Sequence, residues 1–226
     1  MRAIDYAGIL KHQPIFSQFT DAECEELSAY CTPRNLVKNE HLFQQGEAAT
    51  GFYIVVHGRI KLALQAPRGA EKVVEIVTDG GSFGEAAMFI GKPYPVLAQA
   101  LCESLVIFVR REFVVARIAS DPQFARNMLC LLSHQLHGLI ADVESYSLKS
   151  ATERIAAFVL KESARRSSDQ IVLALSKCVL ASRLSITPET LSRTLHQMSS
   201  RGLVEVDGPR IRILDRPQLH DMLQPG

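Results

Sequence analysis

The hydrophobic pattern changes period twice along this 226-residue chain, and no other feature constrains its fold as strongly. Residues 36–113 contain short β-branched and aromatic runs separated by glycine-bearing turns, which is typical of antiparallel strands. Residues 121–146 carry apolar residues at spacings of three and four, which is typical of one long helix. Short helices and a hairpin pattern follow. The sequence therefore predicts an α+β fold with three consecutive parts, 1–120, 121–147 and 148–226.

Four runs in the first part predict strands: FYIVV, RIKLAL, KVVEIV and LVIFV. Turn signals follow these runs at His57-Gly58, Pro67-Arg68-Gly69, Asp79-Gly80-Gly81 and Arg110-Arg111. Strands this closely spaced predict an antiparallel barrel or sandwich. The tract FGEAAMFIGKPYPV is rich in glycine and proline, which break a strand ladder, so we expect a short helix and a loop there.

The middle part predicts one long helix, with Asp121 as its N-cap and Pro122 in its first turn. Its apolar residues follow heptad spacing: Leu129, Leu132, Leu136, Leu139, Val143 and Tyr146. This seam covers about 18 residues, or about 27 Å of helix. The seam could pack on the β domain or pair with its own copy in a parallel dimer. We favour the dimer, because a helix that faces its own core usually has a wider apolar stripe.

The third part begins with the helical segment ATERIAAFVLKESARR and the strand candidate IVLAL. Ser176 is the N-cap candidate of a short amphipathic helix, and Ser185-Ile186 turns the chain. Thr187 then caps a second helix, which has Pro188 in its first turn and is expected to run to Arg201.

A terminal β-hairpin is predicted by the runs LVEV and RIRIL on either side of Asp207-Gly208-Pro209. Two helices joined by a tight turn and followed by a hairpin form a winged helix-turn-helix, whose second helix lies in the DNA major groove. A net charge of +4 from Leu148 onward, against −3 for the rest of the chain, agrees with a surface that faces a polyanion.

The outward residues of the second helix predict its base contacts: Pro188, Glu189, Ser192 and Arg193. A glutamate accepts a hydrogen bond from cytosine, and an arginine donates two to guanine. Helix-terminal and hairpin positions suit DNA phosphates instead: Ser176, Lys177, Thr187, Arg210 and Arg212. The alternatives are a first-turn acid that stabilises the helix dipole and a solvated arginine.

The composition favours a cytoplasmic protein. The five cysteines are scattered without a C-x-x-C pair, and the N-terminal MRAIDYAGILKHQPIF lacks the apolar stretch of a signal peptide. The apolar runs are far shorter than the roughly 20 residues that span a bilayer. No membrane span is expected. Catalytic motifs such as H-E-x-x-H and G-x-S-x-G are also missing, so we expect neither an enzyme nor a metal site.

Three stretches resemble the CRP/FNR superfamily in order and spacing: QQGEAATGFYIVVHGRIKL, SFGEAAMF and LSITPETLSRTLHQMSSRGLVEVDG. This resemblance implies a homodimeric transcription regulator with an N-terminal β-roll like the cyclic-nucleotide-binding domain, a long dimerisation helix and a DNA-binding winged helix. It also implies RNA polymerase as a partner. The recognition motif E-x-x-S-R falls on Glu189, Ser192 and Arg193, which implies a TTGAT-N4-ATCAA palindrome. Readers of a TGTGA half-site carry arginine where this chain has Pro188.

The resemblance leaves the effector open. Gly84 and Glu85 lie where cyclic-nucleotide binders have their pocket, but the arginine that holds the phosphate is missing, which disfavours cyclic AMP. A [4Fe–4S] cluster needs four cysteine ligands, and only Cys24 and Cys31 lie near the start, so no cluster is expected.

The third part looks most similar to the Dnr-type regulators, which respond to nitric oxide through haem. This makes haem a candidate cofactor with His12 as axial ligand, although Gln13 and Pro14 stand at the nearest matching positions. The corresponding histidine of the DNA-binding domain is Arg183 here. A regulator that responds to another small ligand, or to none, is the alternative.

Overall fold

A computed structural model describes residues 6–66, 69 and 71–223 of the chain. The chain forms two compact units, Met1–His137 and Gly138–Gly226, and the long helix α5 (Pro122–Leu148) contributes to both. The predicted division into 1–120, 121–147 and 148–226 treats this helix as a part of its own and stays a prediction. The α+β class, with a β domain, a long helix and a C-terminal helix-turn-helix, is confirmed.

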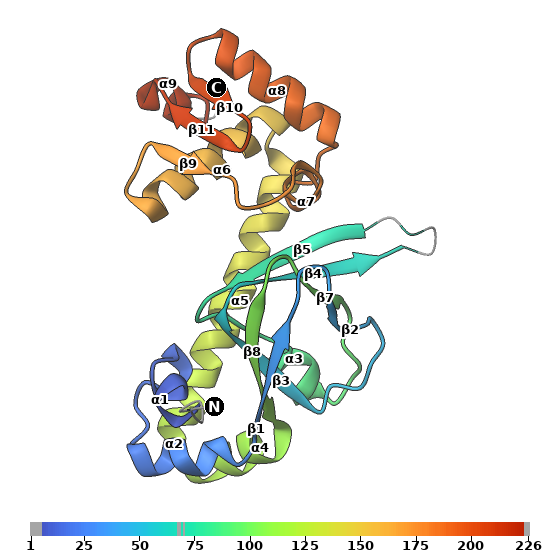
Figure 1. Cartoon of the computed structure of the whole chain (residues 1–226), viewed down its shortest axis with the longest axis vertical. Coiled ribbons are helices and arrows are strands. Elements are labelled where there is room, and N and C mark those ends of the chain that lie inside the picture. The colour runs from blue at the N-terminus through green and yellow to red at the C-terminus, as the bar shows by residue number, and fades with distance from the viewer. Residues whose placement is uncertain (1–5, 67–68, 70, 224–226) are drawn as a thin grey trace. The chain divides into compact units, whose positions relative to one another are not determined.

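Two antiparallel sheets form the β domain of the first unit (Figure 1). One sheet has the order β1-β8-β3-β6 and the other β2-β7-β4-β5. Their bounds are β1 (Cys31–Leu36), β2 (His41–Phe43), β3 (Gly51–His57), β4 (Arg59–Gln65), β5 (Glu71–Thr78), β6 (Ser82–Phe83), β7 (Leu97–Ala100) and β8 (Ser104–Arg110). The four predicted strands correspond to β3, β4, β5 and β8. Of the predicted turn after β4, Pro67 and Arg68 lie outside the described residues.

Strand β3 is buried on both faces and therefore contributes to two cores. Tyr53 and Val55 point into the space between the sheets, where they join Phe43, Phe83 and Tyr94. The neighbouring residues of β3 point to the other side of the strand, as the two-residue period of a strand requires. This alternation explains why the run FYIVV is continuously apolar.

Helices cover the outer face of the β1-β8-β3-β6 sheet. They are α1 (Tyr6–Lys11), the 3-10 turn η1 (Pro14–Phe16), α2 (Asp21–Ser28), α3 (Glu85–Ile90), α4 (Arg111–Ser120) and the first turns of α5. Their apolar side chains pack with Phe52 and Ile54 of β3 into one cluster. The predicted short helix in the FGEAAMF tract is α3. It begins after Gly84 (φ 97°) and ends at Gly91 (φ 64°), both in the left-handed conformation that glycine adopts easily.

Helix α5 begins as predicted. The Asp121 carboxylate accepts hydrogen bonds from the backbone N–H of Gln123 (2.9 Å) and Phe124 (3.1 Å). These bonds satisfy donors that the first helical turn leaves without partners. Phe124 and Met128 are buried in the first unit's core, and the helix continues to Leu148, one residue past the predicted part 121–147.

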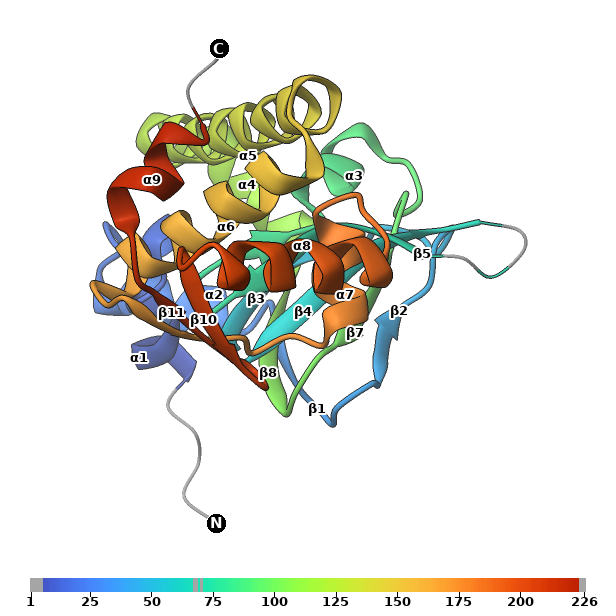
Figure 2. The same ribbon diagram turned by 90° about the horizontal axis from the view of Figure 1, so that it is seen from above.

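The second unit is a small α+β fold. Its elements are α6 (Ala151–Arg166), β9 (Gln170–Val172), α7 (Lys177–Arg183), α8 (Pro188–Ser200), β10 (Val204–Asp207), β11 (Arg210–Ile213) and α9 (Arg216–Asp221). The strands form one antiparallel sheet in the order β10-β11-β9. Figure 2 shows the β10–β11 hairpin beside α8. The predicted strand IVLAL is shorter than expected, because only its first two residues pair in β9.

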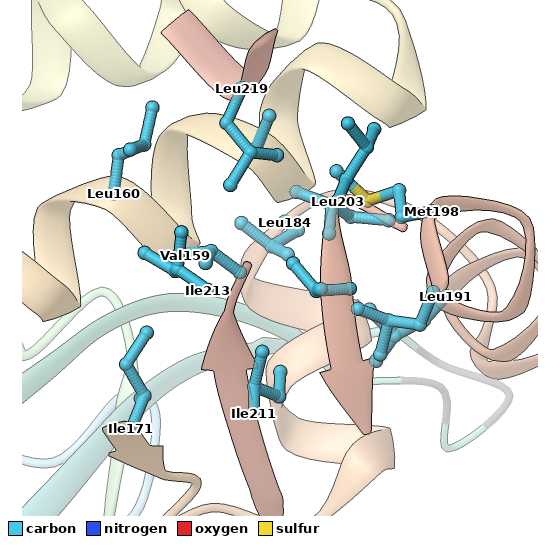
Figure 3. Packing of buried hydrophobic residues seen from close by; sticks show 14 of the residues in the cluster. Val159, Leu160, Ile171, Leu184, Leu191, Met198, Leu203, Ile211, Ile213 and Leu219 are labelled. Carbon is cyan, nitrogen blue, oxygen red and sulfur yellow. The ribbon is translucent and has the colours of Figure 1, made fainter. Parts of the chain in front are cut away.

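One apolar cluster holds the second unit together. Leu191 and Met198 of α8 pack with Leu203 and Ile211 of the hairpin region (Figure 3). The prediction that the hairpin is terminal was wrong, because α9 follows it and inserts the buried Leu219 into the same cluster. Within the described part of the chain, no helix is both long and apolar enough to cross a membrane.

Candidate nucleic-acid interface

Helices α7 and α8 form the helix-turn-helix that the sequence predicts. The Ser176 hydroxyl caps α7 by accepting from the backbone N–H of Val179 (3.3 Å). The chain then turns at Ser185, which has a φ of 58°. The Thr187 hydroxyl caps α8 by accepting from the backbone N–H of Thr190 (3.1 Å), with Pro188 directly after it. Both caps and the turn therefore lie where the sequence places them.

Helix α8 has two different faces. Leu191, Leu195 and Met198 are buried in the core of the second unit. Glu189, Ser192 and Arg193 are exposed on the opposite side, at helical spacings of three and four. The structure thus brings three of the predicted base-reading residues onto one accessible face. Pro188 is half-buried at its edge.

Glu189 and Arg193 present opposite charges on this face. Hydrogen bonds from its own backbone N–H and from the Thr187 side chain lower the pKa of Glu189 below its ordinary value. The carboxylate is therefore ionised at neutral pH and acts as an acceptor. Arg193 has no ion pair to any described residue, so its donors remain available.

The residues predicted to contact phosphates differ in their surroundings. Lys177 and Arg210 are exposed, at the start of α7 and of β11. Arg212 is bound to Glu205 on the neighbouring strand, with Nε 2.7 Å from Oε2. The Ser176 and Thr187 hydroxyls act as helix caps, which leaves their lone-pair capacity only partly used.

Sequence reasoning missed several polar residues that extend this surface along α8. His196, Gln197 and Arg201 are exposed further along the helix. A depression of about 330 Å³ flanks them and is lined by Thr152, Thr194, Gln197, Met198, Ser200 and Arg201. Steps of three and four residues from Ser192 and Arg193 would have identified His196 and Gln197.

Helix α5 has two apolar faces: one is buried in the core of the first unit, and the other is exposed. Four predicted seam residues expose about half or more of their surface: Leu129 (66%), Leu136 (57%), Leu139 (46%) and Val143 (63%). Leu132 is half-buried, and Ile140, which lies outside the strict heptad positions, is 56% exposed. Tyr146 is also half-buried, and its hydroxyl donates to the Arg183 carbonyl oxygen (2.6 Å). The exposed part of the seam therefore ends at Val143.

The region around Gly84 and Glu85 is packed rather than open. Tyr94 stacks on Phe43 with ring centroids 3.9 Å apart, and its hydroxyl donates to the Gly51 carbonyl oxygen (2.8 Å). A Cβ atom on Gly84 would lie 3.0 Å from the Tyr94 ring. Glu85 is 1% exposed, and burial raises its pKa. Its Oε1 has no hydrogen-bond partner among the described residues.

His12 lies beside a surface depression of about 510 Å³. The depression is lined by Gly8, Ile9, His12, Gln13 and Val56. His12 Nδ1 lies 2.6 Å from the Gly8 carbonyl oxygen, to which it donates a hydrogen bond. Gln13 is 7% exposed, and its Oε1 has no partner among the described residues.

The two cysteines near the N-terminus are poorly suited to bind a metal. Burial raises the pKa of Cys24, and it raises that of Cys31 to about 12, which disfavours the thiolate that binds a metal. Cys130 and Cys178 are exposed, and Cys102 is half-buried. In the described ranges, no three His, Cys, Asp or Glu residues are grouped to hold a metal ion.

Comparison with known proteins agrees with this architecture. Residues 33–121 match the cyclic nucleotide-binding domain, and residues 153–222 match the Crp-like helix-turn-helix domain. The transcriptional activator protein Anr of Pseudomonas aeruginosa is 30% identical over 82% of this chain and 78% of its own length.

Two solved structures extend the comparison. FixK2 from Bradyrhizobium japonicum has a TM-score of 0.78 at 24% identity, over 87% of this chain and 98% of that one. DNR from Pseudomonas aeruginosa has a TM-score of 0.52 at 30% identity, over 98% and 99%. The first unit is a β domain of the nucleotide-binding type, the second contains a helix-turn-helix with an accessible polar face, and known regulators match most of the chain. The protein therefore belongs to the CRP/FNR family of DNA-binding transcription regulators.

Proposed function

We propose that the protein is a homodimer that reads a TTGAT-N4-ATCAA palindrome through α8. The observation that carries this proposal is the joint exposure of Glu189, Ser192 and Arg193 on the face of α8 opposite its buried side. A carboxylate and a guanidinium on one face can read a cytosine N4 donor and the O6 and N7 acceptors of a guanine. Lys177 and Arg210 would contact phosphates, which position the helix without reading sequence.

The exposed face of α5 supports a dimer. Leu129, Leu136, Leu139 and Val143 form a continuous apolar stripe along the helix, and burying it against a second copy removes that surface from water. Parallel pairing creates a two-fold axis, and a palindrome has the same symmetry, with half-sites about one helical turn apart. RNA polymerase would be the further partner of such a regulator.

Replacement of Glu189 tests base recognition. Glu189→Ala should weaken binding to the TTGAT palindrome by about 1–3 kcal/mol and relax the preference at the base pair that it reads. Asp221→Ala, which removes an exposed acid from α9, is the matched control. Binding is measured against single-base operator variants across a range of salt concentrations, because phosphate contacts alone give salt dependence without base preference. Unchanged discrimination by Glu189→Ala would contradict the proposal.

We further propose haem as the effector-binding cofactor, with nitric oxide as the signal. The supporting observation is His12: its Nδ1 donates to the Gly8 carbonyl oxygen, and the residue lines a depression together with the apolar Ile9 and Val56. A histidine whose Nδ1 is held by a backbone carbonyl in this way would be suited to hold a haem iron, because the hydrogen bond fixes the orientation of the ring. The haem iron would supply the gas-binding site, while His12 would hold the group and Gln13 would offer a polar contact beside it.

An anaerobic titration with ferrous haem tests this cofactor. The wild-type protein should take up one haem per chain, with an absorbance change on addition of nitric oxide and a change in binding to the TTGAT duplex. His12→Ala should lose stoichiometric uptake, whereas the control His220→Ala, on α9, should keep it. Equal uptake by both variants would reject His12, and no uptake by the wild type would reject haem.

Cyclic AMP is disfavoured as the effector by the packing inside the β domain. Tyr94 and Phe43 stack where Gly84 begins α3, and Pro93 and Pro95 flank Tyr94 in place of an arginine. A cyclic phosphate would find no bidentate donor there. Isothermal titration with cyclic AMP is expected to give no heat of binding.

A further inference from the structure

The end of α5 is fastened to the helix-turn-helix by a group of polar contacts inside the second unit. Arg183, the last residue of α7, forms an ion pair with Asp142 of α5, with Nη2 2.8 Å from Oδ2. The Arg183 guanidinium also donates to the Tyr146 hydroxyl, and that hydroxyl donates to the Arg183 carbonyl oxygen. Asp142 and Tyr146 are one helical turn apart. Both ends of Arg183, side chain and backbone, are therefore held by the same face of α5.

A second arginine holds the turn that follows. Nη1 of Arg154, on α6, lies 2.8 Å from the Leu184 carbonyl oxygen and 3.0 Å from that of Ser185. Ser185 has a φ of 58°, a conformation that residues other than glycine rarely adopt. The end of α7 is thus held by α5, and the turn that follows it is held by α6. Thr187 caps α8 only two residues later.

We propose that Asp142, Tyr146 and Arg183 are positioning residues for DNA recognition: they set the direction of α8 relative to the axis of α5, and thereby the spacing of the two half-sites that a dimer can read. This inference rests on the proposed dimeric reading of a palindrome. It also gives Tyr146 a role other than dimerisation, because this residue has heptad spacing but its hydroxyl is hydrogen-bonded to Arg183. The last turn of α5 then serves the DNA-binding unit rather than the seam.

The geometry suits orientation better than overall stability. The Asp142 and Arg183 side chains keep 27% and 25% of their surface exposed, and a partly exposed ion pair by itself contributes little to folding. The orientation of Arg183 at the end of α7 is nevertheless well defined, because the ion pair and the two Tyr146 hydrogen bonds restrain this residue at separate points. Each base pair added between half-sites moves the second site by about 3.4 Å and rotates it by about 34°, so a fixed α8 direction selects one spacer length.

The test compares palindromes with spacers of three to six base pairs. Asp142→Asn removes the ion pair with Arg183, and Tyr146→Phe removes both hydrogen bonds of the Tyr146 hydroxyl, each with little change of shape. We expect them to reduce the preference for the four-base-pair spacer by about tenfold, within the range measured for coupled neighbouring residues. Base preference within a half-site should not change. Glu144→Gln, an exposed α5 residue, is the matched control. The charge-reversed pair Asp142→Arg with Arg183→Asp should recover part of the spacer preference.

A measurement without DNA separates this inference from the proposed function. Hydrogen exchange of the backbone amides of residues 184–187, 189 and 190 should become faster in Asp142→Asn and Tyr146→Phe than in the wild type and in Glu144→Gln. Unchanged exchange in Asp142→Asn and Tyr146→Phe would overturn the inference. So would an unchanged spacer preference in these variants, if the wild type binds the palindrome. If the wild type binds no palindrome but exchange is faster in the two variants, the contact with Arg183 is supported and the proposed function is rejected.

Discussion

Leu136 offers the most direct test of pairing through α5. Its side chain is 57% exposed in the single chain, and a parallel partner helix would cover that surface. Full burial of a leucine side chain contributes about 1.5–3 kcal/mol, so covering this fraction contributes about 0.9–1.7 kcal/mol per copy. A two-fold dimer contains two copies. Leu136→Ala should therefore weaken dimerisation by about 1.7–3.4 kcal/mol, which is about 20–300-fold in the dissociation constant.

Sedimentation equilibrium over a range of protein concentrations measures this constant. Leu148→Ala is the matched control, because Leu148 is 77% exposed on the same helix but lies a third of a turn away from Leu136 around the axis. It should leave dimerisation unchanged. If both substitutions weaken association equally, or if neither does, the exposed stripe of α5 is not the dimer interface.

Three further predictions concern individual contacts. Thr187→Ala removes the cap of α8 and should lower the free energy of unfolding, measured with urea, by about 1 kcal/mol. Thr187→Ser keeps the hydroxyl and should lose much less stability. Equal losses in the two variants would contradict a capping role. Iodoacetamide at pH 8 should modify the exposed Cys178 well before Cys31, whose pKa burial raises to about 12; peptide mass spectrometry that finds Cys31 modified first would refute this order. Hydrogen bonds from the Thr20 backbone, Arg117 and the Thr20 hydroxyl lower the pKa of Glu23 from 4.5 to about 2, so its contribution to stability is present above pH 4.5 and is lost as the pH falls towards 2. Glu23→Gln should flatten the stability profile over this interval, and an unchanged slope would show that other carboxylates control it.

The elements with local signals were predictable from sequence. Asp121, Ser176 and Thr187 each act as the cap that the pattern indicates, because capping needs only a side chain and the next few backbone N–H groups. The strands that were missed depend on distant partners. β1 contains Pro33 and is mostly polar, and it forms by pairing with β8, more than sixty residues later.

The candidate site was predictable to a similar degree. Helical spacing from the Thr187 cap is enough to place Glu189, Ser192 and Arg193 on one face, because the opposite face is apolar. The same spacing placed Tyr146 on the seam, yet its hydroxyl bonds to Arg183. Periodicity reports which residues share a face but not which neighbour covers them. That neighbour, the end of α7, is brought near by the fold of the second unit.

Helix α5 is unbroken from Pro122 to Leu148, so the number of residues between two of its positions also determines the rotation between them around the helix axis. Within α5, one residue inserted at Gly138 would turn the remaining turns of the helix by about 100° and advance them by about 1.5 Å, whereas seven inserted residues would return them to within about 20° of their starting phase. A chimera joined to a relative within this helix must therefore conserve helical phase. Length differences of one heptad should be tolerated in such a protein far better than differences of one or two residues.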